Sequence, residues 1–220
     1  EDLQILDPVI NSLDSKIKID LARQAEDEVY GTDERIISVS SYYSDNVSNM
    51  ILADSNGFKG ESGSSSVGLY AVVSVKGETG RPSDYWVESD IFFDKLKKTG
   101  IGKTALEKAL KKLNPKKAVS GKYKIIVENR VAGNLLRPFI SALYGSSLYQ
   151  KNSFLIGKAN TRVASDKLSF YDDPLIISGF GSRNFDSEGL NAVKRDIVDQ
   201  GILRNYLIDT YYGRKLNLKP

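Results

Sequence analysis

The chain contains no cysteine and no histidine among its 220 residues, and this absence constrains the fold more than any other feature. Disulfide bonds and zinc sites built from these residues cannot hold the structure together, so a packed core and hydrogen bonds must do so. A hydrophobic fraction of 40% can supply that core, in one domain or two small ones. Without imidazole or thiol groups, this chain also lacks a Ser-His-Asp triad and a cysteine nucleophile.

The charges are nearly balanced, with 31 Lys+Arg against 28 Asp+Glu and a formal charge of +3. This balance does not indicate a nucleic-acid-binding protein. The longest apolar stretches, such as Leu69 to Val73 and Ile125 to Val127, are far shorter than the roughly 20 residues of a membrane span. The sequence therefore predicts a soluble chain.

Hydrophobic spacing predicts a helix followed by strands in the first part of the chain. Apolar residues four apart predict an amphipathic helix over 17–30. Short β-branched and aromatic runs at 35–41 and 47–53, separated by Ser-Asp-Asn, predict an antiparallel hairpin. Asp54-Ser-Asn-Gly57 is a strong turn signal. The Gly- and Ser-rich stretch 60–68 is interpreted as a loop before a strand at 69–75.

Further along, strand and helix signals alternate again. The patterns predict strands over 85–93 and 123–128, helices over 102–113 and 132–144, and a hairpin made of runs 193–198 and 202–208. Pro138 is expected to lie in a first helical turn or to kink the second helix. Together these elements predict an α+β fold, with antiparallel sheet regions and packed amphipathic helices.

Gly102-Lys103-Thr104 at a helix start invites comparison with a phosphate-binding loop. That motif also needs a glycine five residues before Gly102, where this chain has Lys97, and no clean strand leads into it. Nucleotide binding is therefore disfavoured.

A lysine-rich segment, residues 94–124, carries eleven lysines against two acidic residues. Such a segment could attract phosphates or an acidic partner. It contains no arginine and only one aromatic residue, Tyr123. The contacts that specify nucleic-acid sequence are therefore lacking. A solvated helix face is the favoured interpretation.

Asp172, Asp173, Asp186 and Glu188 are the one acidic cluster suited to a hard cation such as Mg²⁺ or Ca²⁺, or to general acid catalysis. Their spacing does not match an EF-hand loop. Asp residues before Pro and Gly are also what turns require, because their side chains bond nearby backbone N–H groups. Turn scaffolding is favoured, while an independent hydrolase using these carboxylates stays open as an alternative.

Six sequence pieces in the second half, in order and spacing, resemble the TldD/PmbA family, whose older label is modulator of DNA gyrase. The pieces are 131–137 (Val-Ala-Gly-Asn-Leu-Leu-Arg), 152–157, 163–165, 171–174 (Tyr-Asp-Asp-Pro), 181–189 and 201–210. The first half is similar in layout to the family's middle region. The resemblance implies a fragment of a larger TldD/PmbA-type fold, with residues 1–120 as a middle region and 121–220 as the start of a β-rich C-terminal region.

The resemblance also points to family-motif positions with an implied structural or cleft role: Gly133, Ser153, Asp172, Asp173, Asp186, Glu188 and Gly189. In the family's catalytic branch, one helix carries His-Glu-x-x-x-His, two zinc ligands and a glutamate that activates water. In this chain, those three positions correspond to Arg137, Pro138 and Ala142. None of the three can ligate zinc or activate water.

The resemblance therefore implies the PmbA/TldE branch, a cytoplasmic, non-catalytic subunit of a zinc-dependent peptidase that acts on unfolded peptides. Zinc is expected only in a catalytic partner, which would be a TldD-type paralogue or a second copy of this chain. Arg137 could bind a carboxylate of the substrate or the partner. The expected peptide-binding mode is addition to a strand edge, with Val193 to Ile208 as candidates. The alternative is a gyrase or nucleic-acid accessory protein that uses the lysine-rich segment.

Overall fold

The computed structural model describes residues 2–220, which divide into two compact units. The first unit runs up to Val119 and includes the segment Ile176–Ser182, and the second comprises Ser120–Leu175 and Arg183–Pro220. Both contain helices and antiparallel strands, so the predicted α+β class with antiparallel sheets is confirmed. Within the described residues, no helix combines the length and apolar character that crossing a bilayer requires.

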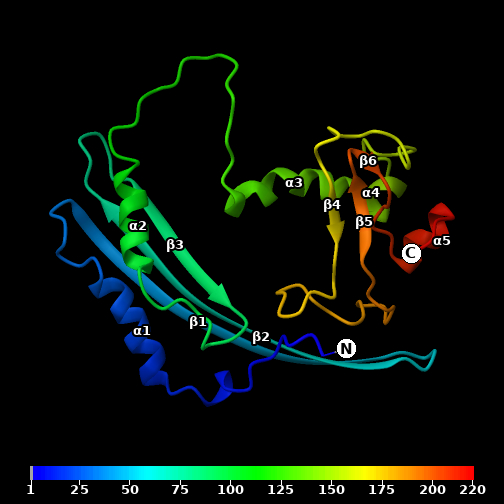
Figure 1. Ribbon diagram of the computed structural model, residues 1–220, viewed down its shortest axis with the longest axis horizontal. Helices are drawn as coiled ribbons and strands as arrows, with labels where there is room; N and C mark the ends of the chain where they lie inside the picture. Colours follow the sequence, from blue (N-terminus) through cyan, green and yellow to red (C-terminus); the bar gives the residue numbers. More distant parts are fainter. Residues whose placement is uncertain (1) are drawn as a thin grey trace. The chain divides into compact units, whose positions relative to one another are not determined.

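The first unit is built on a three-stranded antiparallel sheet in the order β1-β2-β3, made of Ile36–Ala53, Lys59–Val75 and Ser83–Asp90. The short helix η1 (Ile10–Ser12) and the helices α1 (Ser15–Asp27) and α2 (Ile101–Leu110) complete it. Both α-helices run along this sheet (Figure 1). Alternate residues of β2 from Val67 to Val75 are buried beneath them, together with Ala25, Ala105 and their neighbours.

Alternation explains why this sheet has one covered face. Successive side chains of a strand point to opposite faces, so a buried residue at every second position places the intervening residues on the other side. In β2, each buried residue from Ser65 to Val75 is followed by a partly exposed one. The predicted helices at 17–30 and 102–113 are confirmed, each within three residues at either end.

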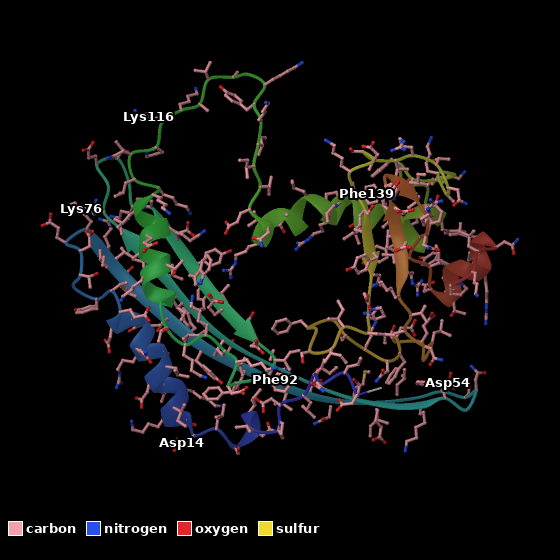
Figure 2. The ribbon with its side chains drawn as sticks, in the orientation of Figure 1. Asp14, Asp54, Lys76, Phe92, Lys116 and Phe139 are labelled. Atoms are coloured by element: carbon pink, nitrogen blue, oxygen red, sulfur yellow. The ribbon has the colours of Figure 1, made fainter. Side chains whose placement is uncertain are left out.

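Two predictions for this sheet are wrong. Residues 35–41 and 47–53 belong to one continuous strand, β1, and the stretch 60–68 is strand rather than loop. The hairpin is instead formed by β1 and β2 around the turn at Asp54, which Figure 2 labels at its tip. Pairing with β2 gives the backbone of Ser44, Asp45 and Asn46 strand partners, and this outweighs their preference for turns.

The N-terminus of α2 is occupied by a side chain of the same unit. Glu28 accepts hydrogen bonds from the backbone N–H groups of Gly100 and Gly102 at 2.6 and 2.9 Å. A Cβ atom on Gly102 would lie 2.1 Å from the carbonyl oxygen of Ala25, so glycine permits α1 and α2 to pack closely. The features that resembled a phosphate loop thus serve helix capping and helix packing.

The second unit contains the helices α3 (Asn129–Leu143), α4 (Gly145–Tyr149) and α5 (Thr210–Leu216). Its sheet, in the order β4-β5-β6, consists of Phe170–Asp172, Arg195–Asp199 and Ile202–Leu203. The predicted hairpin of runs 193–198 and 202–208 is present as β5 and β6, but its second strand ends at Leu203 rather than at Ile208. A small core surrounds Leu143, Leu155 and Leu203, with the ring of Phe139, labelled in Figure 2, packed against it.

The predicted strand at 123–128 is wrong. These residues have no regular secondary structure, and the side chains of Ile125 and Ile126 are 80% and 99% exposed. No strand of the described residues pairs with this stretch, and an apolar run without a pairing partner cannot form a ladder. Pro138 lies well inside α3 rather than in its first turn.

Candidate functional site

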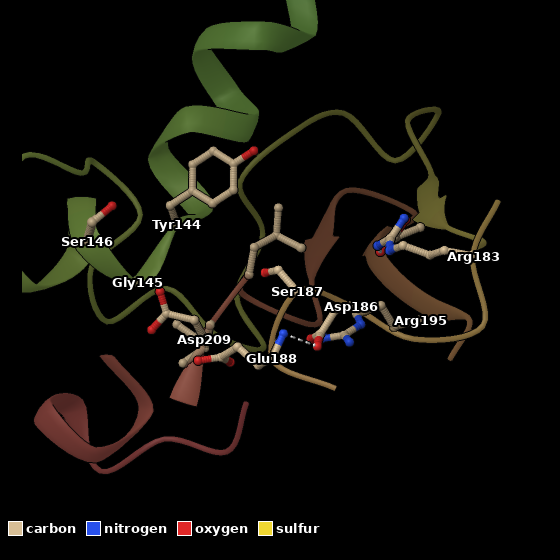
Figure 3. A pocket seen from close by; sticks show the side chains of 12 residues that line it. Tyr144, Gly145, Ser146, Arg183, Asp186, Ser187, Glu188, Arg195 and Asp209 are labelled. Carbon is tan, nitrogen blue, oxygen red and sulfur yellow. Dashed lines mark hydrogen bonds and ion pairs between the residues drawn. The ribbon is translucent and has the colours of Figure 1, made fainter. Parts of the chain in front are cut away.

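A polar hollow of about 270 Å³ in the second unit collects more charged side chains than any other described concavity of that unit. It is lined by the start of α4, the end of β4, the turn 186–188, the first residue of β5 and the residues before α5 (Figure 3). Four carboxylates, of Asp172, Asp186, Glu188 and Asp209, face two guanidinium groups there. Mixed charges of this kind suit a zwitterionic or hydrogen-bonding ligand.

Close backbone packing forms one wall of the hollow. The N–H of Gly145 donates to the carbonyl of Leu207 at 2.9 Å, and the N–H of Leu207 donates to the carbonyl of Leu143 at 3.0 Å. A Cβ atom on Gly145 would lie 2.6 Å from Cβ of Tyr212, so this position requires glycine. The corner between α3 and α4 is thereby tied to the segment that leads into α5.

A tight turn places two of the predicted acidic residues in the hollow. One carboxylate oxygen of Asp186 accepts hydrogen bonds from the backbone N–H groups of Glu188 and Leu190, both at 2.9 Å. Figure 3 shows the first of these bonds as a dashed line. Gly189 has φ +78°, the left-handed conformation that glycine adopts without strain. Asp186 thus uses one oxygen to hold the turn.

The start of α5 fixes two more carboxylates. Glu188 accepts hydrogen bonds from the backbone N–H and the hydroxyl of Thr210, at 2.8 and 2.9 Å. Asp209 caps the same helix by accepting from the N–H of Tyr212 at 2.7 Å. Both carboxylates are thereby held in place by backbone N–H groups of the first turn of α5.

The two arginines of the hollow come from a strand and from a loop. Arg195 begins β5 and is the strand partner of Asp172 in β4, and Arg183 lies 3.7 Å from a carboxylate oxygen of Asp172. The Nε atom of Arg195 is buried and has no hydrogen-bond acceptor within the described residues. A buried donor of this kind is satisfied by water or by a ligand.

Other predicted site residues lie outside this hollow. Asp173 pairs with Lys194 at 2.9 Å, and the hydrogen bond from Lys194 lowers the pKa of that carboxyl. The hydroxyl of Ser153 is buried, donates to the carbonyl of Ala142 at 2.6 Å and accepts from the N–H of Leu155 at 3.0 Å. Gly133 lies on an open part of α3.

The three positions that correspond to the family's zinc motif lie along α3. Arg137 and Pro138 are exposed, whereas Ala142 is 5% exposed in the small core. Arg137 and Ala142 are five positions apart on this helix, the same spacing as the two histidines of the motif. Nowhere in residues 2–220 do three or more acidic residues gather as a set that could hold a metal ion.

Tyr144, Arg183, Arg195 and Asp209 are among the residues of the hollow that sequence reasoning did not single out. A signal was present for Asp209, because Asp before a helical run is a typical N-cap. The arginines reach the site through strand pairing and turn geometry, which the one-dimensional pattern does not record.

The candidate strand edge at Val193 to Ile208 is not open. β5 is the middle strand of its sheet, with β4 and β6 on its two sides. Leu203 of β6 exchanges hydrogen bonds with Asn160 and Thr161, since its carbonyl accepts at 2.7 Å and its N–H donates at 3.0 Å. The described residues therefore leave no long free edge there for a peptide.

The lysine-rich segment is partly engaged in contacts within the first unit. Lys112 pairs with Asp84 at 3.1 Å, Lys97 with Glu88 at 3.8 Å, and Lys98 donates to the carbonyl of Phe93 at 2.6 Å. The side chains of Lys116, labelled in Figure 2, and Lys117 are exposed on the stretch that follows α2. Only part of the segment's charge is thus presented freely to solvent.

Comparison with known proteins places this architecture among peptidases. The profile of the PmbA/TldA metallopeptidase central domain matches residues 8–113, and that of the C-terminal domain matches residues 120–220. A protein named metalloprotease PmbA homolog from Haemophilus influenzae is 33% identical over 201 residues, which cover 90% of this chain and 45% of the relative. The chain thus spans about half the length of the curated relatives it matches.

Two solved structures share the fold. A protein named as a candidate modulator of DNA gyrase from Bacteroides thetaiotaomicron superposes with a TM-score of 0.98 at 44% identity, over all of this chain and 51% of the other. TldE from Thermococcus kodakarensis superposes with a TM-score of 0.75 at 16% identity, over 96% of this chain and 48% of the other. The second likeness concerns the fold alone.

Proposed function

The chain belongs to the PmbA/TldD metallopeptidase family, and on that premise we propose that it is part of a PmbA/TldE-like subunit that does no hydrolysis itself. In this proposal, the subunit pairs with a TldD-type paralogue or with a second copy of itself in the cytoplasm. It contributes surface for an unfolded peptide and for the subunit interface. Zinc is held by the catalytic partner.

The observation that carries the proposal is the set of side chains at the zinc-motif positions of α3. Arg137 is a permanent cation, Pro138 has no carboxylate, and Ala142 has no donor atom. The sequence contains no histidine and no cysteine that could replace them as ligands. The surrounding glycine, serine and acidic turn elements are nevertheless present, which favours a retained fold without the metal chemistry.

The hollow of the second unit supports a role in binding rather than in hydrolysis. Asp186, Glu188 and Asp209 each use a carboxylate oxygen to accept hydrogen bonds from backbone N–H groups, so they maintain turns and a helix start. Arg195 offers a buried donor without an acceptor among the described residues. Arg137 is exposed on α3 and can pair with a carboxylate of a substrate or partner.

The test uses the full-length parent of this chain. Cleavage of an unstructured peptide is measured with the parent alone, with a paralogue that carries His-Glu-x-x-x-His, and with the mixture, each with and without a zinc chelator. We expect cleavage only in the mixture and its loss on chelation. A paralogue whose motif glutamate is replaced by glutamine provides the matched inactive control.

Cleavage by the parent alone would contradict the proposal. If that activity fell in Asp186→Asn and returned with Mg²⁺ or Mn²⁺, the acidic residues would be catalytic after all. Equal cleavage by the paralogue with and without the parent would instead show that this subunit is dispensable for hydrolysis.

The nucleic-acid alternative has its own test, because one structural neighbour is named for DNA gyrase. Lys111, Lys116 and Lys117 are exposed, so their replacement by glutamate should abolish DNA retention and flatten its salt dependence if the segment binds phosphates. Unaltered retention in that variant would exclude this segment as a DNA-binding site.

A further inference from the structure

One face of the sheet in the first unit carries no charged side chain. This face is formed by the even positions of β1 from Ser38 to Met50, the even positions of β2 from Ser62 to Ser74, and the odd positions of β3 from Ser83 to Ser89. Their side chains are serine and tyrosine, with a few valine, glycine, asparagine and methionine residues. We call this the serine–tyrosine face.

The register defines this face independently of composition. Tyr42 is the partner of Tyr70, and Tyr70 is the partner of Val87, so these residues point to the same side of the sheet. The opposite side carries Leu69, Ala71 and the other odd-numbered residues of β2 from Val67 to Val75, which are buried beneath α1 and α2. The serine–tyrosine face is therefore the side that these helices leave uncovered.

Three tyrosines form a row across all three strands. The ring centroids of Tyr42 and Tyr70 are 6.0 Å apart, and those of Tyr70 and Tyr85 are 5.4 Å apart, all within the range of favourable aromatic contact. Tyr42 and Tyr85 are 59% and 50% exposed. Large exposed rings that are supported by one another form a rigid platform, because little side-chain entropy remains to be lost on binding.

The absence of charge decides what such a platform can accept. Single-stranded nucleic acids stack on aromatic rings, but their phosphates require neighbouring cations, and this face has none. Uncharged hydroxyl groups both donate and accept hydrogen bonds, which matches the N–H and C=O groups of an extended main chain. Tyrosine and serine are also the residues that antibody binding loops use to contact varied protein surfaces.

We propose that the serine–tyrosine face binds an uncharged stretch of unfolded peptide, with the row of tyrosines stacking on its side chains and the serines bonding its main chain. The inference rests on the proposed function for its choice of a peptide, and it places the contact in the first unit rather than at the strands 193–208. An extended chain rises about 3.3 Å per residue, so the row of rings accommodates roughly three to four residues.

The experiment measures binding of fluorescein-labelled peptides to the full-length parent by fluorescence polarisation. One probe is an unstructured peptide of Ser, Gly, Asn, Pro and Tyr, and the second is the same peptide with every third residue replaced by Glu. Tyr42→Ser and Tyr85→Ser remove rings from the edge strands. Tyr30→Ser, which removes a tyrosine that is 79% exposed three residues after α1, is the matched control.

We expect each ring deletion to weaken binding of the neutral peptide by about three- to tenfold, because it removes one aromatic contact with the peptide. Tyr30→Ser should leave the affinity unchanged, the acidic peptide should bind more weakly, and salt should have little influence on the neutral peptide. Ser44→Lys, which introduces a charge without removing a ring, should weaken the neutral peptide and strengthen the acidic one.

Three outcomes would overturn the inference: no binding of the neutral peptide, equal affinity of Tyr42→Ser, Tyr85→Ser and the parent, or tighter binding of a single-stranded oligonucleotide. The cleavage assay with the catalytic paralogue separates this failure from that of the proposed function. Chelator-sensitive cleavage by the mixture, unaffected by either ring deletion, would leave the subunit role standing and remove the serine–tyrosine face from it.

Discussion

The two units of this chain reach stability by different means. In the first, the long central strand β2 buries every second residue beneath two helices, and Val67, Leu69 and Val73 are at most 2% exposed. In the second, the strands are at most five residues long, and side chains such as Ser153 and Asp186 bond to backbone groups in turns. One unit relies mainly on burial of apolar area and the other relies heavily on local polar contacts.

This difference has a functional side. A regular sheet whose alternate residues build the core is free to vary the residues on its other face, and here that face is uncharged. A turn-rich unit positions charged groups from distant parts of the sequence around one hollow, as Asp172, Arg195 and Asp209 show. The first arrangement suits a broad contact, and the second suits a few directed ones.

The largest expected effect comes from the core of the first unit. Leu69→Ala removes a fully buried side chain between the sheet and the helices, and we expect a loss of about 4 kcal/mol in the free energy of unfolding. Denaturant unfolding measures it, with Leu135→Ala, at a site 66% exposed on α3, as the control. A loss below 1 kcal/mol would contradict the idea that burial dominates this unit.

The sequence predicted well the parts of the fold that depend on local spacing. The four-residue spacing around Leu21 predicted a helix and the residues from Asp54 predicted a turn, and the folded chain has α1 and the β1-β2 turn at these places. The continuity of β1 through Ser44 and Asn46 could not be predicted in this way, because it depends on backbone partners in β2. The predicted strand at Ile125 failed for the opposite reason, because the run is apolar but pairs with no strand of the described residues.

The candidate site was predicted in part. Asp172, Asp186 and Glu188 do reach one hollow, whereas Asp173 turns to Lys194 instead. Asp172 is the last residue of β4 and Asp173 lies just beyond it, where its carboxylate pairs with Lys194 instead of lining the hollow. Which arginine joins the cluster depends on pairing between β4 and β5, and a single sequence does not specify that pairing.

Ser153 tests the polar half of the comparison. Ser153→Ala removes a buried hydroxyl that serves both the carbonyl of Ala142 and the N–H of Leu155, so we expect a loss of about 2 kcal/mol. Ser147→Ala is the matched control, because its hydroxyl bonds the carbonyl of Ser141 at an accessible site and should change stability by about 0.5 kcal/mol. Equal values for the two variants would indicate that buried turn contacts do not hold the second unit.

Tyr43 offers a smaller effect in the first unit, confined to alkaline pH. Burial, together with the negative charge of Asp45, raises the pKa of the Tyr43 hydroxyl from 10.0 to about 12. A raised folded-state pKa means that the neutral form is favoured, so its contribution is complete below pH 10 and is lost as the pH rises through about 12.

Tyr43→Phe should therefore match the parent at pH 7 and lose less stability than the parent between pH 10 and 12. Phenylalanine keeps the ring packed against the core and removes only the group that ionises. Thermal unfolding at several pH values measures the difference between the two proteins. Parallel alkaline losses in both would show that Tyr43 ionises as an ordinary tyrosine.

The smallest effect concerns the exposed pair of Asp173 and Lys194 in the second unit. The hydrogen bond from Lys194, and then that from the N–H of Leu175, lower the pKa of the Asp173 carboxyl below 3.8. A lowered folded-state pKa contributes stability that is present above the unfolded value and is lost as the pH falls through the folded one.

Because the pair is open to solvent, screening by salt keeps this contribution small. Asp173→Asn should lower the melting temperature slightly at pH 7 and low salt, by less than Ser153→Ala does. The deficit should shrink at high salt and diminish as the pH falls below 3.8. A deficit that persisted unchanged in acid would mean that Asp173 acts through its backbone turn rather than through its charge. That result would extend to this exposed site the reliance on local hydrogen bonds that distinguishes the second unit from the first.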